Sequence, residues 1–163
     1  VQTCALPIWL RHPLFFCMTM DNTFTEIQKV MEPNLVLLDI KEDESAQMIR
    51  IIIDSERPVT LEDTVGLMKT VNNDETLMSL FPESYRLEIT SPGMGAELKR
   101  KFQFRKNVGK ILEIKVVENG EYIKRLGLLS DANENEITIE QDGESFCFDY
   151  DAIKSAKIKI SFN

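Results

Sequence analysis

The sequence has few of the residues from which common catalytic and metal sites are built. Its 163 residues include one histidine, His12, and three cysteines, Cys4, Cys17 and Cys147. A single histidine argues against a histidine-based metal site and against a Ser-His-Asp triad. An odd number of cysteines without CxxC spacing fits neither a disulfide framework nor a zinc site, and it indicates a reducing compartment. We expect no catalytic residues, no metal and no cofactor.

Long hydrophobic runs and a general surplus of positive charge are also missing. No apolar run approaches the roughly 20 residues that span a bilayer, so the sequence predicts no transmembrane helix. The net charge of -8 argues against indiscriminate binding to nucleic acids. We therefore expect a cytoplasmic protein that does not contact a membrane.

The first 17 residues differ in composition from the rest of the chain. They include the only tryptophan and the only histidine, and Arg11-His12-Pro13 interrupts the apolar run that a signal peptide requires. The string also resembles translated sequencing-adapter DNA. We interpret residues 1–17 as a non-native or disordered leader, with Met18 or Met20 as the true start.

Residues 18–90 have the pattern of a small α/β domain. A capping box, Thr23-x-x-Glu26, predicts a first helix that Pro33 ends, and Thr60-x-x-Asp63 predicts a second helix that ends at residues 72–74. The expected strands are residues 34–40, 48–54 and 85–90, the first two forming a hairpin. This order predicts an α/β sandwich, a three-stranded sheet with two helices on one face.

A proline and two glycines interrupt the chain after residue 90. The stretch Ser91-Pro92-Gly93-Met94-Gly95 combines a fixed φ with two positions that allow positive φ. We expect residues 91–95 to form an interdomain hinge, with Ser91, Pro92, Gly93 and Gly95 as its key residues.

Residues 96–163 change to short strands with tight turns. Asn119-Gly120 and Asp142-Gly143 are signals for type I′ hairpins, and a short helical turn is expected near residues 150–154. The expected strands are residues 111–117, 122–130, 136–140, 144–149 and 156–162. They predict a small Sm-like or SH3-like β-barrel. The fold class is therefore α+β, with the barrel after the α/β domain.

Positive charge is concentrated in one short segment. Residues 91–115 carry seven basic and two acidic side chains, a net charge of +5, whereas residues 18–90 have a net charge of -9. Such a segment suits contacts with phosphate groups. The candidate contact residues are Lys99, Arg100, Lys101, Arg105, Lys106 and Lys110.

The basic segment has competing interpretations. It could be a solvated turn, or it could dock on the acidic domain within the same chain. Phe102 and Phe104, which lie between the charges, fit a hydrophobic core better than a platform for stacked bases. Cys147 alternates with Phe146 and Phe148, which favours a structural thiol in a strand over a nucleophile.

Several stretches of the sequence resemble one bacterial family. They are Val59-Thr60-Leu61-Glu62-Asp63, Tyr85-Arg86-Leu87-Glu88-Ile89-Thr90-Ser91-Pro92-Gly93, Asn107-Val108-Gly109-Lys110 and Phe148-Asp149-Tyr150-Asp151-Ala152-Ile153. Residues from about 20 to 163 resemble the ribosome maturation factor RimP. The chain departs from the family's Leu-Asp-Arg-Pro-Leu after the junction, where it has Met94-Gly95-Ala96-Glu97-Leu98.

The resemblance implies a function that composition and periodicity do not reach. It implies a non-enzymatic factor that assists assembly of the small (30S) ribosomal subunit by binding the immature particle. The implied partners are ribosomal RNA and a basic ribosomal protein of that subunit, and we expect the factor to be a monomer. Two other readings stay open: a generic Sm-like or SH3-like interaction module without a ribosomal role, and a hydrolase that uses two carboxylates of the acidic domain.

Overall fold

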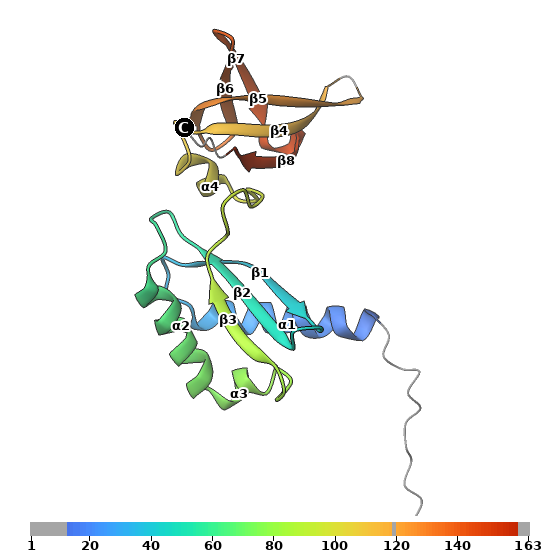
Figure 1. Cartoon of the computed structure of the whole chain (residues 1–163), viewed down its shortest axis with the longest axis vertical. Coiled ribbons are helices and arrows are strands. Elements are labelled where there is room, and N and C mark those ends of the chain that lie inside the picture. The colour runs from blue at the N-terminus through green and yellow to red at the C-terminus, as the bar shows by residue number, and fades with distance from the viewer. Residues whose placement is uncertain (1–12, 119, 160–163) are drawn as a thin grey trace, which may run out of the picture. The chain divides into compact units, whose positions relative to one another are not determined.

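A computed structural model describes residues 13–118 and 120–159, and the chain divides into two compact units (Figure 1). Unit 1 comprises the chain up to Asp54 together with Val59–Ser91, and unit 2 comprises Ser55–Pro58 together with the chain from Pro92 onward. Among the described residues, no helix has the length and apolar character needed to cross a membrane.

Unit 1 contains a mixed sheet and three helices. Strand β1 pairs antiparallel with β2, and β2 pairs parallel with β3, so β2 is the central strand. The elements are α1 (Pro13–Val30), β1 (Val36–Asp43), β2 (Met48–Asp54), α2 (Leu61–Asn73), α3 (Glu75–Met78) and β3 (Arg86–Thr90).

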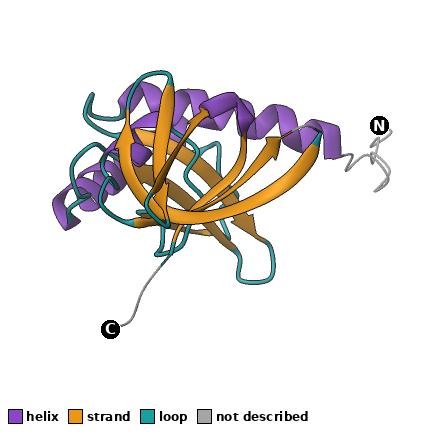
Figure 2. Cartoon of the chain, turned by 90° about the horizontal axis from the view of Figure 1, so that it is seen from above, coloured by secondary structure: helices purple, strands orange, loops and turns teal. Residues whose placement is uncertain are grey.

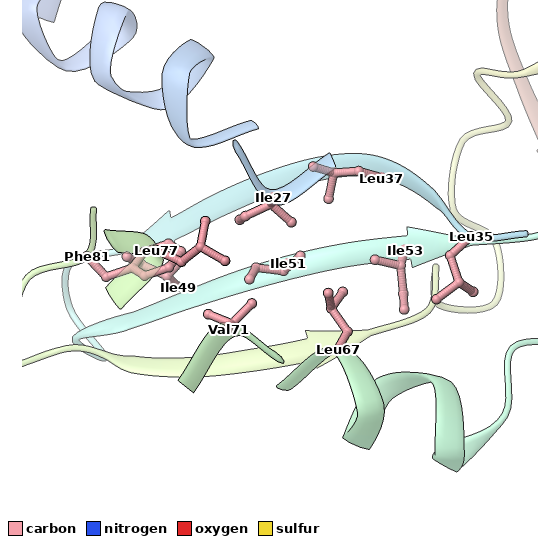
Figure 3. Packing of buried hydrophobic residues seen from close by; sticks show 10 residues of the cluster. All are labelled: Ile27, Leu35, Leu37, Ile49, Ile51, Ile53, Leu67, Val71, Leu77 and Phe81. Atoms are coloured by element: carbon pink, nitrogen blue, oxygen red, sulfur yellow. The ribbon is translucent and has the colours of Figure 1, made fainter. Parts of the chain in front are cut away.

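The core of unit 1 lies between this sheet and its helices. Strand β2 contributes every second residue, because successive side chains of a strand point to opposite faces. These residues are Ile49, Ile51 and Ile53. Figure 3 shows them beside Leu37 of β1, Ile27 of α1 and two residues of α2. The buried cluster consists of Ile27, Leu35, Leu37, Ile49, Ile51, Ile53, Leu67, Val71, Leu77 and Phe81.

Helix α2 begins at the predicted capping box. The backbone N–H of Asp63 donates to the Thr60 hydroxyl at 3.3 Å, and the Thr60 N–H donates to the Asp63 carboxylate at 2.7 Å. These two bonds satisfy N–H groups that the first helical turn otherwise leaves without partners. The helix ends at Asn73, as predicted from residues 72–74.

Helix α1 begins earlier than predicted. Thr23 lies inside the helix and is 3% exposed, so the predicted capping box at Thr23 is wrong. The helix instead starts at Pro13, a residue whose fixed φ suits the first helical position. Residues 13–17 of the expected leader are therefore helical, and residues 1–12 lie outside the described residues.

Unit 2 is a five-stranded antiparallel sheet. Its strand order is β7-β6-β5-β4-β8, and within the described residues no hydrogen bonds join β7 to β8, so the sheet is not closed by hydrogen bonds. Strands make up most of this unit, and Figure 2 colours the strands of the whole chain orange and its helices purple. The elements are α4 (Lys101–Arg105), β4 (Ile111–Glu118), β5 (Glu121–Ala132), β6 (Glu136–Gln141), β7 (Glu144–Asp149), the 3₁₀ turn η2 (Tyr150–Ala152) and β8 (Ile153–Ile158).

The second core lies on the inner face of this sheet. Leu112, Ile114 and Val116 of β4 are fully buried, so the residues between them point to the opposite, outer face. Phe104 of α4 packs into the same core. The buried cluster consists of Phe104, Leu112, Ile114, Val116, Leu129, Ala132, Ile137, Ile139, Phe148 and Ala156.

One of the two predicted hairpin turns lies among the described residues, and it has the expected conformation. Asp142 and Gly143 have φ angles of 55° and 85°, the two positive values that a type I′ turn requires. Asn119 of the other predicted hairpin turn lies outside the described residues.

Strand β8 begins at Ile153, three residues before the predicted start, and residues 160–163 of the predicted last strand are outside the described residues. The α+β class is confirmed.

Candidate functional site

The basic segment forms the link into unit 2 and its first helix. Lys99 and Arg100 precede α4, Lys101 and Arg105 are its first and last residues, and Lys106 follows it. Lys110 lies one residue before β4. All six predicted contact residues are exposed except Arg105, which is partly buried.

A buried glutamine fixes the backbone of this segment. Gln103 is 1% exposed, and its side-chain oxygen accepts the N–H groups of Lys99 at 2.8 Å and Arg100 at 3.0 Å. The Asn107 side chain in turn donates to the Gln103 carbonyl at 2.7 Å. The two exposed cations before α4 therefore project from a backbone that buried polar groups hold in place.

The aromatic residues of the segment have a structural role. Phe104 is 4% exposed and meets the Tyr150 ring edge to face, with 5.3 Å between the ring centroids. Phe102 is partly buried. The interpretation of Phe104 as a core residue rather than a stacking platform is confirmed. Burial raises the pKa of Tyr150, whose hydroxyl donates to the Asn133 carbonyl at 2.8 Å.

Two cations of the segment meet at the turn between β5 and β6. The Arg105 guanidinium is paired with the Glu134 carboxylate and also with Glu56, the latter at 3.2 Å. Lys101 donates to the backbone carbonyl of Glu134, and its ammonium lies 5.2 Å from the centroid of the Tyr150 ring. Arg105 is thus largely neutralised, whereas these contacts leave the charge of Lys101 in place.

Two other cations contact neutral oxygen atoms. Lys106 donates to the Ser55 carbonyl at 3.0 Å, and Lys110 donates to the Asn107 side-chain oxygen at 2.8 Å. A neutral acceptor orients an ammonium group without cancelling its charge. The structure therefore brings Lys101 and Arg105 together, and it places Lys110 against a different residue, Asn107.

The expected hinge residues form a turn outside the regular elements. The N–H of Ala96 donates to the Gly93 carbonyl at 3.0 Å, and Gly95 has a φ of 76°. The two units divide between Ser91 and Pro92. That the turn acts as a hinge remains a prediction.

Two glutamates that bind the basic segment were not found from the sequence. Glu134 and Glu56 are separated from Arg105 by 29 and 49 residues, so no local spacing connects them. In the described part of the chain, no three His, Cys, Asp or Glu side chains come together in a way that could hold a metal ion.

A family model matches the N-terminal part of the chain. Residues 25–95 match the RimP N-terminal domain, a region that includes most of unit 1 and the turn after β3. The match contains the Thr60 capping box and the stretch from Tyr85 to Gly93 on which the resemblance was based. RimP proteins are non-enzymatic ribosome maturation factors. Residues 25–95 of the chain are therefore identified as a RimP N-terminal domain.

Proposed function

We propose that this protein assists assembly of the small ribosomal subunit by binding its immature particle. The observation that carries the proposal is the match of residues 25–95 to the RimP N-terminal domain. On this proposal the protein acts by binding, in the cytoplasm, and needs no cofactor.

The basic segment is the surface that we propose for contact with ribosomal RNA. Arg100 and Lys101 are exposed at the start of α4, and Lys110 is exposed between α4 and β4. Lys101 donates to the Glu134 carbonyl and Lys110 donates to the Asn107 side-chain oxygen, and both acceptors are neutral. Cations held in this way suit contact with phosphate oxygens, because the phosphate backbone supplies most of the electrostatic affinity for nucleic acids.

The acidic surface of unit 1 suits a different partner. Residues 18–90 carry a net charge of -9, which would repel RNA and attract a basic protein. We therefore propose that a basic ribosomal protein of the small subunit is the second partner, and that the factor binds as a monomer.

Sedimentation with immature small subunits tests the proposal. The full chain should sediment with these particles, and changing Lys99, Arg100 and Lys110 together to alanine should weaken this association. Each lost phosphate contact should lower the slope of log affinity against log salt by roughly 0.7 to 0.9. Folding should change little, because exposed charges typically contribute within about 0.5 kcal/mol.

A matched control removes three lysines elsewhere. Lys29, Lys41 and Lys69 are exposed residues of α1, β1 and α2, so their alanine variant loses the same formal charge from unit 1. It should keep the original salt slope. If the full chain does not sediment with immature subunits and recovers only other proteins, the chain is a generic interaction module. If the first triple variant loses thermal stability at an unchanged salt slope, the basic segment is structural.

A further inference from the structure

A second group of lysines lies on the outer face of the unit 2 sheet. In the strand register Lys115 of β4 pairs with Lys124 of β5, and Glu113 of β4 pairs with Lys157 of β8. The backbone N–H of Lys159 donates to the Ile111 carbonyl at 2.8 Å, which continues the same alternation. We call Lys115, Lys124, Lys157 and Lys159 the outer lysine face.

The alternation of β4 sets the direction of these side chains. Leu112, Ile114 and Val116 are fully buried on the inner face, so Glu113 and Lys115 point outward. Residues paired directly across neighbouring strands lie on the same face. All four residues of the outer lysine face are exposed.

One carboxylate lies among these lysines. The Lys124 ammonium bonds the Glu113 carboxylate at 2.9 Å. This hydrogen bond, with further attraction from Lys124, Lys159 and Lys115, lowers the pKa of Glu113 below its ordinary value of 4.5. The backbone of Glu97 forms an isolated antiparallel β-bridge with Lys157 at the edge of the sheet, which brings a second carboxylate near these lysines. Four lysines therefore outnumber the two neighbouring carboxylates.

The pairing of Lys115 with Lys124 is unfavourable by itself. Like charges directly opposite each other on neighbouring strands destabilise a sheet, and their Cβ atoms are about 4.5–5.5 Å apart. Glu113 relieves part of this repulsion through Lys124. A bound anion would relieve the rest, so the arrangement favours an anionic partner.

An open groove borders the same face. It has a volume of about 290 Å³ and is lined by Gly95, Glu113, Lys157, Ile158 and Lys159. Two lysines at one groove can hold a phosphate group between them. Residues two apart on a strand are about 7 Å from each other, so Lys157 and Lys159 present two separated charges along the groove.

An exposed aromatic residue lies farther along the outer face. Tyr122 of β5 pairs with Val117 of β4 and is 77% exposed, and Leu126 on the same side of β5 is 44% exposed. An open aromatic ring beside positive charges is the combination that binds single-stranded nucleic acid, in which bases stack on the ring and phosphates meet the cations. An acidic peptide would use the charges but not the ring.

We propose that the outer lysine face binds a single-stranded segment of RNA, with phosphates at the lysines and a base on Tyr122. This surface contains none of the six candidate contact residues between Lys99 and Lys110, and the identification of the RNA as ribosomal rests on the proposed function. The protein would then contact RNA through two separate parts of unit 2.

The test measures binding of the full chain to a labelled oligouridylate of about 12 nucleotides at several salt concentrations. The K115Q/K124Q and K157Q/K159Q variants should each bind more weakly and lower the salt slope by up to about 1.4, or roughly 0.7 for each contact to a single strand. Changing Tyr122 to alanine should weaken binding without changing the slope. The matched control K41Q/K69Q removes two exposed lysines of unit 1 and should behave like the original chain.

The outcomes separate this proposal from the proposed function. If both pairs of variants bind the oligonucleotide as tightly as the control does, the proposal is overturned. It is also overturned if they lose only their binding to immature subunits, because the face then contacts a protein. If the oligonucleotide results are as expected but the original chain does not sediment with immature subunits, the RNA-binding face stands and the ribosomal function fails. Thermal midpoints equal to or slightly above the original show that the variants fold.

Discussion

At the scale of single residues, Gly127 is the position where the sheet of unit 2 leaves no room for a side chain. A Cβ atom there would lie 2.5 Å from the Glu140 carbonyl oxygen and 2.5 Å from the Ile139 side chain. Changing Gly127 to alanine should push β6 away from β5 and destabilise the unit by about 1–3 kcal/mol. Urea unfolding followed by circular dichroism measures this loss.

Gly93 provides the comparison. A Cβ atom at Gly93 would meet nothing within 4 Å. The alanine variant should therefore change the free energy of unfolding by less than about 1 kcal/mol. An increase is also consistent with this, because alanine reduces the conformational freedom of the unfolded chain. Equal losses at Gly127 and Gly93 would show that β5 and β6 are not this close.

Gln103 makes a second residue-scale prediction. Changing it to leucine removes the oxygen that accepts the Lys99 and Arg100 N–H groups. Because buried donors without partners are costly, the variant should lose about 1–3 kcal/mol of stability. A glutamate variant keeps an acceptor at this position, so it should retain the backbone conformation of the segment, as amide chemical shifts of Lys99 and Arg100 would report. Identical shifts in the leucine variant would contradict this role.

The stability that Glu113 contributes to unit 2 depends on pH. Its lowered pKa means that the folded state favours the ionised carboxylate, first through the Lys124 hydrogen bond. The resulting stability is present above the unfolded value near 4.5 and is lost as pH falls through the folded pKa. In the Lys124→Ala variant, an NMR titration should show the Glu113 pKa moving up toward 4.5. Lys154→Ala should leave it unmoved, and an unchanged pKa in the first variant would disprove the pairing.

At the scale of elements, the start of α2 depends on its capping box. Changing Thr60 to alanine removes the acceptor for the Asp63 N–H and should cost about 0.5–2 kcal/mol. A serine at this position keeps the hydroxyl and should recover most of the loss. Thr70→Ala, in the exposed part of the same helix, should have a much smaller effect on the thermal midpoint of unit 1. Equal effects at the two threonines would contradict the cap.

The regular elements were predictable where the signal is local. The capping box at Thr60 and the turn at Asp142-Gly143 need only neighbouring residues, and both occur as predicted. Helix α3 was not predicted, because Asp74 ends α2 and caps α3 at the same time. Helix α4 was missed because its N-cap is Arg100, which is not a typical capping residue, and because Gln103 inside the helix accepts the N–H groups of Lys99 and Arg100 before it.

The candidate site was only partly visible in the sequence. The run of cations from Lys99 to Lys110 is a local feature and could be counted. The neutralisation of Arg105 by Glu134 depends on the fold, because the two residues meet across α4 and the β5–β6 turn. The outer lysine face depends on register, since Lys157 joins it only through pairing of β8 with β4. A period of two around Lys115, Lys157 and Lys159 is the signal that could have indicated it.

At the scale of the whole molecule, the two units predict separable folding. A chain that begins at Pro92 should retain a β-rich circular dichroism spectrum, because the second core draws on residues beyond that point. It should melt at a lower temperature than unit 2 in the full chain, because Lys106 and Arg105 lose their contacts to Ser55 and Glu56. Domains of about 70 residues bury only about 60% of their unfolded surface, so small losses matter. A random-coil spectrum would contradict this prediction.

The parallel pairing of β2 with β3 has a consequence for synthesis on the ribosome. The β1–β2 hairpin is complete at Asp54, whereas β3 begins at Arg86. At 5–20 residues per second, the apolar strand β2 emerges roughly two to six seconds before its second neighbour. During that interval one edge of an isoleucine-rich strand is open to pairing with another nascent chain. Slowing translation after β2 has emerged and before β3 emerges should therefore increase aggregation, whereas equally slow translation after β3 has emerged should not.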